Sequence, residues 1–304
     1  MGSRNSGNNK INSNNLNCLP REIIYEILTR VPAESLVRFK LVCKLWKTII
    51  SDPNFISSHL HIWKSKPSFM FTADLSSNRL LLSDFQDEDS TDFPIRIPKG
   101  YRHIVASTDG LLLLEGSEQK DGRLVTKLCV HNPVTGSQKL LPPTLNHRVI
   151  QQDNFSIVCD ASIQKYKVVL FIDDGGIIHD KIHIITGDND VDRGSIEWRE
   201  LISPSAFCLE FGFRPITVNG ILHWLAYAYD VKSFYNPPLL VGSVQSMDIA
   251  KEEFRQGISL PCQPKSDSCR RLINCYLLEI EGSIYFSNPA TEMELELMDV
   301  GGFG

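Results

Sequence analysis

The residues that could do chemistry fall in a few short motifs, and the most metal-like of them is incomplete. Asp188, Asp190 and Asp192 alternate as they do at the start of a calcium-binding loop. In such a loop the sixth position is glycine and the twelfth is a glutamate that binds the ion through both oxygens. Here these positions hold Arg193 and Arg199. We therefore interpret this segment as a polar turn between two strands.

The other candidate motifs lack their companion residues. His179 and His183 are four apart, but the glutamate of the HExxH zinc motif is absent between them. The sequence SIQK at Ser162 resembles a nucleophile motif whose two companion motifs are missing. The three cysteines after residue 260 have no CxxC spacing, which argues against a zinc site. We therefore predict no catalytic residue, metal or cofactor, and a protein that is not an enzyme.

Composition gives the setting for these motifs. The chain has 304 residues, of which 42% are hydrophobic and 22% charged, and its formal net charge is -5. This length suits about two globular domains, and the mild acidity argues against wholesale binding to nucleic acid or an anionic membrane. No apolar run approaches the roughly 20 residues that cross a bilayer. The eight cysteines form no paired framework, so we expect reduced thiols in the cytoplasm, the nucleus or both.

The N-terminal part divides into a polar tail and a helical segment. Residues 1–16 are rich in Asn, Ser and Gly, which predicts a disordered tail. Gly2 also begins a myristoylation pattern, although one so short is common by chance. Residues 17–60 then show helical periodicity. Pro20 suits a first helical position, and Pro32 ends that helix. With a second apolar stripe ending near Asp52-Pro53, we expect two or three helices.

Residues 61–304 show a β pattern instead. Short apolar or alternating runs are separated by Gly, Asp, Asn and Pro turns, as in an all-β domain. A strand–turn–strand layout that ends in an apolar residue and Pro recurs at 127–143, 181–204 and 243–261, and a weaker copy ends at Pro98. The period of roughly 40 to 60 residues favours a kelch-like β-propeller, with a β-sandwich as the alternative. Four repeats and part of a fifth fit, so this domain is either a small ring or C-terminally short.

Two families resemble these two parts. Residues 19–55 resemble the F-box through Leu19-Pro20, Glu26-Ile27-Leu28, Val31-Pro32, Ser35-Leu36, Val42-Cys43-Lys44, Trp46 and the ending Ile50-Ser51-Asp52-Pro53-Asn54-Phe55. Most of residues 100–287 resemble, more loosely, the plant F-box-associated interaction domain. The matching pieces are 104–114, 130–143, 165–169, 218–226 and 246–254.

The resemblance implies a substrate receptor of a Skp–cullin–F-box ubiquitin ligase. In that family the F-box binds a Skp-family adaptor, which docks on a cullin carrying a RING protein, and the β domain holds a target protein for ubiquitination. Apolar helical residues should form the adaptor surface, with Trp46, Ile49 and Ile50 divided between core and partner. The predicted adaptor-binding residues are Leu19, Pro20, Ile23, Ile24, Ile27, Leu28, Pro32, Leu36, Val37, Val42, Trp46, Ile49 and Ile50.

Target-binding residues are harder to predict. Tyr227, Tyr229, Phe234 and Tyr235 lie in or beside a long loop containing Asn-Pro-Pro, and we expect some of them to contact the target. The opposing interpretation is that they pack in the core, where a propeller buries aromatic residues. Two other functions stay open. The basic helices could form a nucleic-acid-binding module, or the β domain could be a stand-alone binding propeller.

Overall fold

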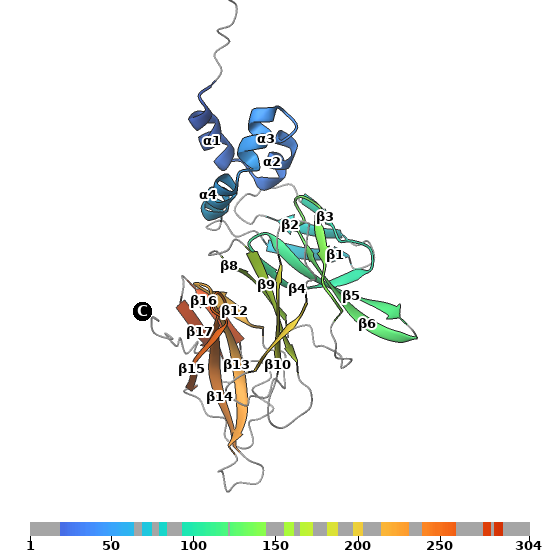
Figure 1. Ribbon diagram of the computed structural model, residues 1–304, viewed down its shortest axis with the longest axis vertical. Helices are drawn as coiled ribbons and strands as arrows, with labels where there is room; N and C mark the ends of the chain where they lie inside the picture. Colours follow the sequence, from blue (N-terminus) through green and yellow to red (C-terminus); the bar gives the residue numbers. More distant parts are fainter. Residues whose placement is uncertain are drawn as a thin grey trace, which may run out of the picture. The chain divides into compact units, whose positions relative to one another are not determined.

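The protein is described here by a computed structural model (Figure 1). It describes residues 19–63, 69–74, 79–83, 93–120, 122–143, 155–160, 165–172, 181–187, 197–202, 214–230, 239–259, 276–280 and 283–287. The chain divides into two compact units. The helical unit comprises Met1–Phe69 with Asp84–Ser90, and the β unit comprises Met70–Ser83 with Thr91–Gly304. None of the helices in these ranges is long and apolar enough to cross a membrane.

Four helices form the helical unit: α1 (Arg21–Thr29), α2 (Ala33–Phe39), α3 (Lys44–Ile50) and α4 (Pro53–Trp63). Pro20 is the N-cap of α1, one residue before the first helical position that the sequence predicted for it, and Pro32, predicted to end the first helix, is the N-cap of α2. The helices enclose one apolar core, and residues from all four contribute to it. The buried core residues are Ile24, Leu28, Leu36, Ile49, Ile50 and Phe55.

The fourth helix differs from the sequence prediction, which ended the second helical stretch at Asp52-Pro53 and expected no further helix there. Pro53 is instead the first residue of α4. Proline suits that position because the first helical N–H groups have no partner within the helix. Asp52 Oδ1 accepts a hydrogen bond from the backbone N–H of Asn54 at 2.8 Å. The segment Asp52-Pro53 therefore starts a helix, and the unit has four described helices where two or three were expected.

A row of aromatic side chains ties α4 to the end of α1. The rings of Phe55, His59 and Trp63 stack at four-residue spacing, with centroids 6.0 and 5.7 Å apart. Trp63 Nε1 donates to the Thr29 carbonyl at 3.1 Å, and His59 Nε2 donates to the Val31 carbonyl at 2.8 Å. The last carbonyls of a helix have no partner within it. Thus α4 satisfies main-chain acceptors at and just after the C-terminus of α1.

The β unit consists of antiparallel sheets that follow one another along the chain. The first contains β1 (Phe69–Asp74), β2 (Arg79–Ser83) and β3 (Phe93–Arg96). The second contains β4 (Tyr101–Thr108), β5 (Leu111–Lys120), β6 (Arg123–His131) and β7 (Gln138–Leu140). The third contains β8 (Phe155–Asp160), β9 (Lys165–Ile172), β10 (Lys181–Gly187) and β11 (Arg199–Ile202). The fourth contains β12 (Ile216–Val218), β13 (Ile221–Asp230), β14 (Leu239–Asp248) and β15 (Glu253–Ser259), and the fifth β16 (Tyr276–Ile280) and β17 (Ser283–Ser287).

The sequence repeats coincide with these sheets. The pairs β6–β7, β10–β11 and β14–β15 are the third and fourth strands of three successive sheets, and they coincide in large part with residues 127–143, 181–204 and 243–261. Within each of these sheets, strands that are neighbours in sequence are also neighbours in space. The predicted strand–turn–strand layout is therefore confirmed as the outer half of a four-stranded sheet.

From the second sheet to the fifth, successive sheets pack face to face. One core cluster joins residues of β5 and β6 to residues of β8, β9 and β10. A second joins β8, β9 and β10 to β13 and β14, and a third joins β12, β13 and β14 to β16 and β17. In β9, Val168 packs toward one neighbouring sheet and Val169 toward the other, because successive side chains in a strand point to opposite faces. This succession is that of propeller blades, and the described strands do not form a closed ring.

Candidate functional site

One side of α1 exposes a row of apolar residues. Ile23 and Ile27 of α1 are four residues apart, and their exposed fractions are 46% and 47%; Leu19, two residues before the helix begins, is 56% exposed. Residues at this spacing lie on the same face of a helix. The adjacent face turns Ile24 and Leu28 into the core, where Leu28 is fully buried. The helix thus has a structural face and, beside it, an apolar face that no described part of the chain buries.

A second apolar group lies where α2 passes into α3. Leu41, Val42 and Leu45 are exposed, and Leu41 has the largest exposed fraction of these at 88%. The connection is ordered by backbone hydrogen bonds: the N–H of Leu41 donates to the Arg38 carbonyl and that of Val42 to the Phe39 carbonyl, both at 3.1 Å. A fixed turn that presents large apolar side chains to water is typical of a protein contact surface.

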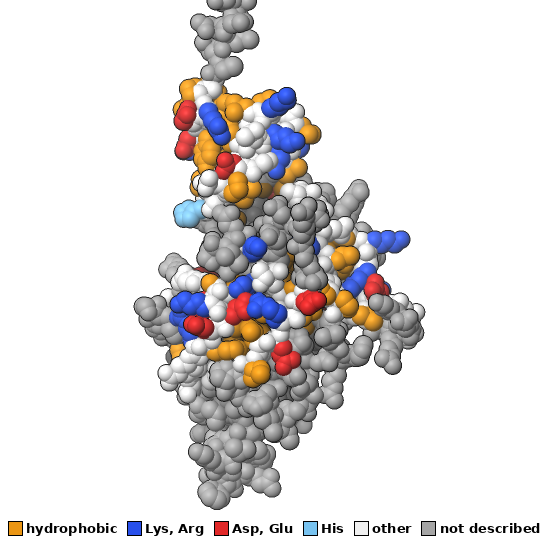
Figure 2. All heavy atoms as spheres, in the orientation of Figure 1, with side chains coloured by type: hydrophobic (Ala, Val, Ile, Leu, Met, Phe, Trp, Pro, Cys, Tyr) orange, Lys and Arg blue, Asp and Glu red, His pale blue; other side chains and the backbone are white. Residues whose placement is uncertain are grey.

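Basic side chains accompany the second apolar group. Arg38, Lys44 and Lys47 are exposed beside it on α2 and α3. Figure 2 shows Lys and Arg side chains next to hydrophobic ones on the surface of the helical unit. An acidic partner would be attracted to such a surface before contact, because complementary charge raises association rates.

The structure divides the predicted adaptor-binding residues into two sets. Exposed members are Leu19, Pro20, Ile23, Ile27, Pro32 and Val42. Val37 is half-buried, and Trp46 is half-buried with its ring 5.3 Å from that of Phe39. Buried members are Ile24, Leu28, Leu36, Ile49 and Ile50, which form the core beneath the surface. The prediction that these five residues contact the partner directly is corrected. Their side chains face the other helices, so they support the exposed residues from beneath.

Among the described residues of the helical unit, four large apolar residues are exposed that were not among the predicted ones: Leu41, Leu45, Ile56 and Ile62. Leu41 lies in a turn, where helical periodicity carries no information about facing. Leu45 precedes Trp46 and falls outside the stripe that Trp46, Ile49 and Ile50 define. Leu41 could have been predicted from its place in a short, basic connection between two helices, because large apolar side chains are unusual there.

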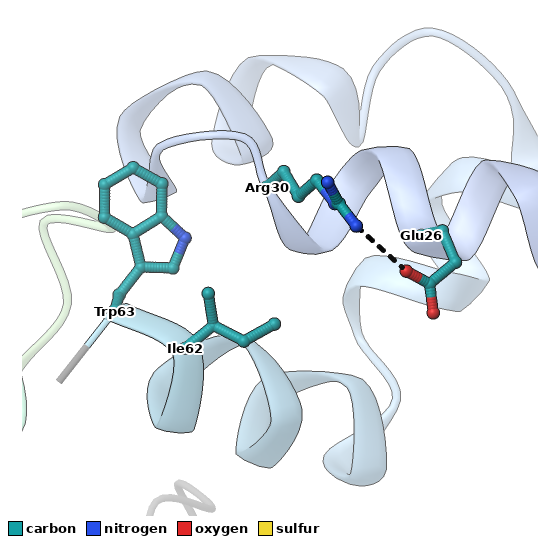
Figure 3. Close-up of a pocket in the computed structure, with 4 residues that line it drawn as sticks. All are labelled: Glu26, Arg30, Ile62 and Trp63. Atoms are coloured by element: carbon teal, nitrogen blue, oxygen red, sulfur yellow. Dashed lines mark ion pairs between the residues drawn. The ribbon is translucent and has the colours of Figure 1, made fainter. Parts of the chain in front are cut away.

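A pocket of about 440 Å³ lies between α1 and α4, lined by Glu26, Arg30, Ile62 and Trp63 (Figure 3). Arg30 and Glu26 are one helical turn apart and form an ion pair of 3.8 Å, with both side chains largely exposed. Such exposed pairs contribute little to stability. The pocket lining includes no cysteine, serine or histidine, so it offers no nucleophile–base pair for catalysis.

The predicted target-binding residues cannot be placed as side chains. Tyr227 and Tyr229 belong to β13, but their side chains lie outside the described residues, as do Phe234 and Tyr235 altogether. Asp188, Asp190, Asp192 and Ser162 also lie outside the described part of the chain. Among the residues that the structure describes, no group of three or more His, Cys, Asp or Glu side chains could hold a metal ion.

Burial shifts the pKa of three acid–base groups of the β unit, namely Tyr101, Cys129 and His223. It raises the pKa of Tyr101 to about 12 and also raises that of the Cys129 thiol, which is buried in the same cluster. Burial lowers the pKa of His223 to about 4, and its Nδ1 lies 2.7 Å from Ser246 Oγ. These shifts keep each group neutral at physiological pH, the behaviour of core residues and not of activated nucleophiles.

Comparison with protein families accounts for both units. The F-box domain family matches residues 16–58, and the F-box associated beta propeller domain family matches residues 78–279. The second match covers most of the chain and includes every complete four-stranded sheet. The chain belongs to the F-box proteins with an F-box-associated β-propeller domain. In this F-box protein, α1 to α3 and the first residues of α4 make up the matched F-box, and His59 and Trp63 extend it.

Curated relatives of this F-box protein come from Arabidopsis thaliana. A putative F-box/kelch-repeat protein is 26% identical over 257 residues, which cover 80% of this chain and 64% of that protein. An F-box/LRR-repeat protein is 25% identical over 281 residues, which cover 86% of this chain and 60% of that protein. The chain thus spans less than two thirds of the length of these relatives.

Solved structures give only a distant similarity. A Bombyx mori GH32 beta-fructofuranosidase in complex with sucrose has 13% sequence identity and a TM-score of 0.33, covering 68% of this chain and 47% of that enzyme. This similarity is too low to support an argument about fold or activity.

Proposed function

We propose that this F-box protein is the substrate-recognition subunit of a Skp–cullin–F-box ubiquitin ligase. The observation that carries the proposal is the pair of exposed apolar groups on the F-box, one formed by Leu19, Ile23 and Ile27 and the other by Leu41, Val42 and Leu45. A Skp-family adaptor would cover them, since the interior of a stable interface is apolar and closely packed. We will call these six residues the F-box surface.

The proposal assigns the two units separate tasks. The helical unit connects the protein through the adaptor to a cullin and its RING protein, and the β unit holds a target protein. No residue of this chain then needs to take part in bond making, because tethering raises the effective concentration of target lysines near the conjugating enzyme. F-box proteins of this family are typically non-catalytic receptors. The proposed compartment is the cytoplasm or nucleus, which the reduced thiols of Cys43 and Cys129, among the described cysteines, support.

Co-purification of the full chain with a Skp-family adaptor tests this function. The double variant Ile23→Asp/Ile27→Asp places two charges on the exposed face of α1 without touching the core. We expect it to lose adaptor binding while its circular dichroism and melting temperature stay close to those of the wild type. Ser57→Asp, at an exposed position on α4, is the matched control and should bind normally.

Two results would contradict this proposal. If the wild-type chain does not bind any Skp-family adaptor, the F-box surface has another partner and the ligase role is excluded. If Ile23→Asp/Ile27→Asp binds as tightly as the wild type, this face of α1 is not the adaptor surface. A salt-sensitive shift of DNA by the full chain would instead favour the nucleic-acid alternative.

A further inference from the structure

One exposed hydroxyl borders the F-box surface. Thr48 lies on α3, and its side chain is exposed. On the helix it neighbours Lys44, four residues before it, and Leu45, three residues before it. Leu45 belongs to the second apolar group of the F-box surface. A group added to Thr48 would therefore stand at the margin of the surface that the proposed function assigns to the adaptor.

The hydroxyl of Thr48 bonds within its own helix. Its Oγ1 donates to the Lys44 carbonyl at 3.0 Å, a usual arrangement for threonine inside a helix. This bond joins α3 to no other element of the helical unit. Replacing the hydroxyl proton would therefore leave the packing of the four helices in place.

The charge around Thr48 has one sign. Residues 38–48 contain four basic residues and no acidic one, and we call them the basic run. Arg38, Lys44 and Lys47 of this run are exposed. A phosphate group carries a charge of about −1.5 to −2 at neutral pH. A single phosphate would thus cancel close to half of the local positive charge and reduce the attraction for an acidic partner.

Thr48 differs in this respect from the other hydroxyl residues of the unit. Five more Ser and Thr residues lie in the described part of the helical unit: Thr29, Ser35, Ser51, Ser57 and Ser58. Thr29 is buried, and Ser35 and Ser58 are half-buried and accept hydrogen bonds from neighbouring side chains. Ser51 and Ser57 are exposed, but both lie outside the basic run. Among the described residues, Thr48 combines exposure with a basic setting.

We propose that Thr48 is a phosphorylation site and that phosphate at this position releases the adaptor from the F-box surface. The inference rests on the proposed function, because the partner that is released is the adaptor. It adds a means of regulation to that function. The same chain would act as a receptor when Thr48 is unmodified and would stand apart from the ligase when it is phosphorylated.

The modification transfers the γ-phosphoryl group of ATP, and a protein kinase catalyses it. A bond forms between Thr48 Oγ1 and the γ-phosphorus, and the bond from that phosphorus to the oxygen bridging to the β-phosphate breaks. A base of the kinase takes the hydroxyl proton, and ADP leaves with the bridging oxygen.

The adaptor and the kinase would compete for this part of the chain. The helix α3 has seven residues, and no side chain of its N-cap residue Cys43 caps it. A helix this short depends on packing, here the burial of Ile49 and Ile50 in the core. A kinase can reach Thr48 when this helix opens locally, whereas a bound adaptor would cover the helix. Saturating adaptor should therefore slow phosphorylation.

Binding by variants of the full chain tests the effect of charge. We expect Thr48→Glu to lower the rate of association with a Skp-family adaptor by about tenfold at low salt, and the difference to shrink as salt is added. Thr48→Gln has nearly the same shape without the charge and should bind as the wild type does. Ser57→Glu places the same charge on α4 and should also bind normally.

Two results of this comparison would overturn the proposal. One is an equal association rate for Thr48→Glu and Thr48→Gln. The other is a deficit of Thr48→Glu that salt does not reduce, because it would reflect damage to α3 instead of charge. Failure of the proposed function looks different, since the wild-type chain then binds no adaptor at any salt concentration.

Mapping of phosphate on the chain is the second measurement. The full chain is expressed in cells of Arabidopsis thaliana, the organism of the curated relatives, and its phosphopeptides are identified by mass spectrometry. We expect phosphate on Thr48, and less of it when the adaptor is overexpressed. Phosphate on other residues of the chain with none on Thr48 would overturn the proposal.

Discussion

The carboxylate of Glu252 accepts two hydrogen bonds from the guanidinium of Arg199, at 2.7 and 2.9 Å. The buried ammonium of Lys167 lies 3.0 Å from the same carboxylate and donates to the Ile249 carbonyl at 2.6 Å. Lys167 and Arg199 belong to β9 and β11, whereas Glu252 follows β14 in the next sheet. The hydrogen bond from Arg199 holds the pKa of Glu252 below its usual range. One carboxylate therefore joins two adjacent sheets.

The first prediction concerns this carboxylate. We expect Glu252→Gln to lower the free energy of unfolding of the β unit by about 3 kcal/mol, because it leaves the buried Lys167 without its counter-charge. Denaturant titration measures the change. Arg199→Ala should cost about 1 kcal/mol or less, since Arg199 is half-exposed. The double variant Lys167→Met/Glu252→Gln should recover most of the loss, and failure to do so would show that the charge pair is not its cause.

The second prediction is a pH dependence that arises from His223. Burial lowers the pKa of His223 from 6.5 to about 4 in the folded protein, so the unfolded chain binds the proton more readily. The contribution of the neutral imidazole to stability is thus fully present above pH 6.5. It is lost progressively as the pH falls toward about 4, by up to roughly 3 kcal/mol. Thermal unfolding across this range should show a smaller slope for His223→Asn, whose amide can still reach Ser246. An unchanged slope would contradict the assignment.

The third prediction tests the contact between α4 and α1. Trp63→Phe removes the donor to the Thr29 carbonyl but keeps a ring that can stack on His59. We expect a loss of about 1 kcal/mol in the stability of the helical unit. Trp63→Ala should cost about 3 kcal/mol, because the ring contact is also lost. Hydrogen exchange of α1 amides is the measurement, and equal exchange in all three proteins would show that α4 does not stabilise α1.

The fourth prediction separates the core of the helical unit from its surface. Leu28 is fully buried and Leu41 is 88% exposed. Leu28→Ala should lower stability by about 2–5 kcal/mol, and Leu41→Ala should change it by no more than about 0.5 kcal/mol. If the F-box surface binds the adaptor as proposed, Leu41→Ala should weaken that binding at unchanged stability. Isothermal titration with the adaptor measures the binding, and denaturant titration of each variant measures the stability. A destabilised Leu41→Ala would contradict the observed exposure.

The sequence predicted much of the fold because the residues that begin helices and form turns act locally. Pro20 and Pro32 mark the starts of α1 and α2 through the fixed φ of proline. The strand–turn–strand repeats predicted the outer half of three sheets, because Asn132 and Asp248 cap their turns within a few residues. Local chemistry also explains the difference at Pro53. The same residue type can end one helix or begin another, and only the packing of Phe55 on the core distinguishes the two.

Which side chains of the site point outward and which point into the core could not be predicted in the same way. Ile23 and Ile24 are neighbours of the same residue type, yet Ile24 is buried against the other helices and Ile23 is exposed. Periodicity gives a broad apolar side, but the position of the neighbouring helices determines which part of it is covered. Lys167 is a second example. A lysine in an apolar strand suggests an exposed position, and its partner Glu252 is too distant in sequence to suggest burial.

The distribution of tryptophan gives the protein a built-in optical probe for each unit. Of its four tryptophans, Trp46 and Trp63 lie in the helical unit, and Trp198 and Trp224 lie in the β unit. Trp224 is enclosed between Phe171 and Phe254, with ring centroids 5.3 and 6.3 Å away. Its fluorescence should therefore be blue-shifted while the two sheets are together and red-shifted once water enters between them. With Trp46 and Trp63 replaced by Phe, emission colour would follow the opening of the propeller alone, in the intact chain and without a label.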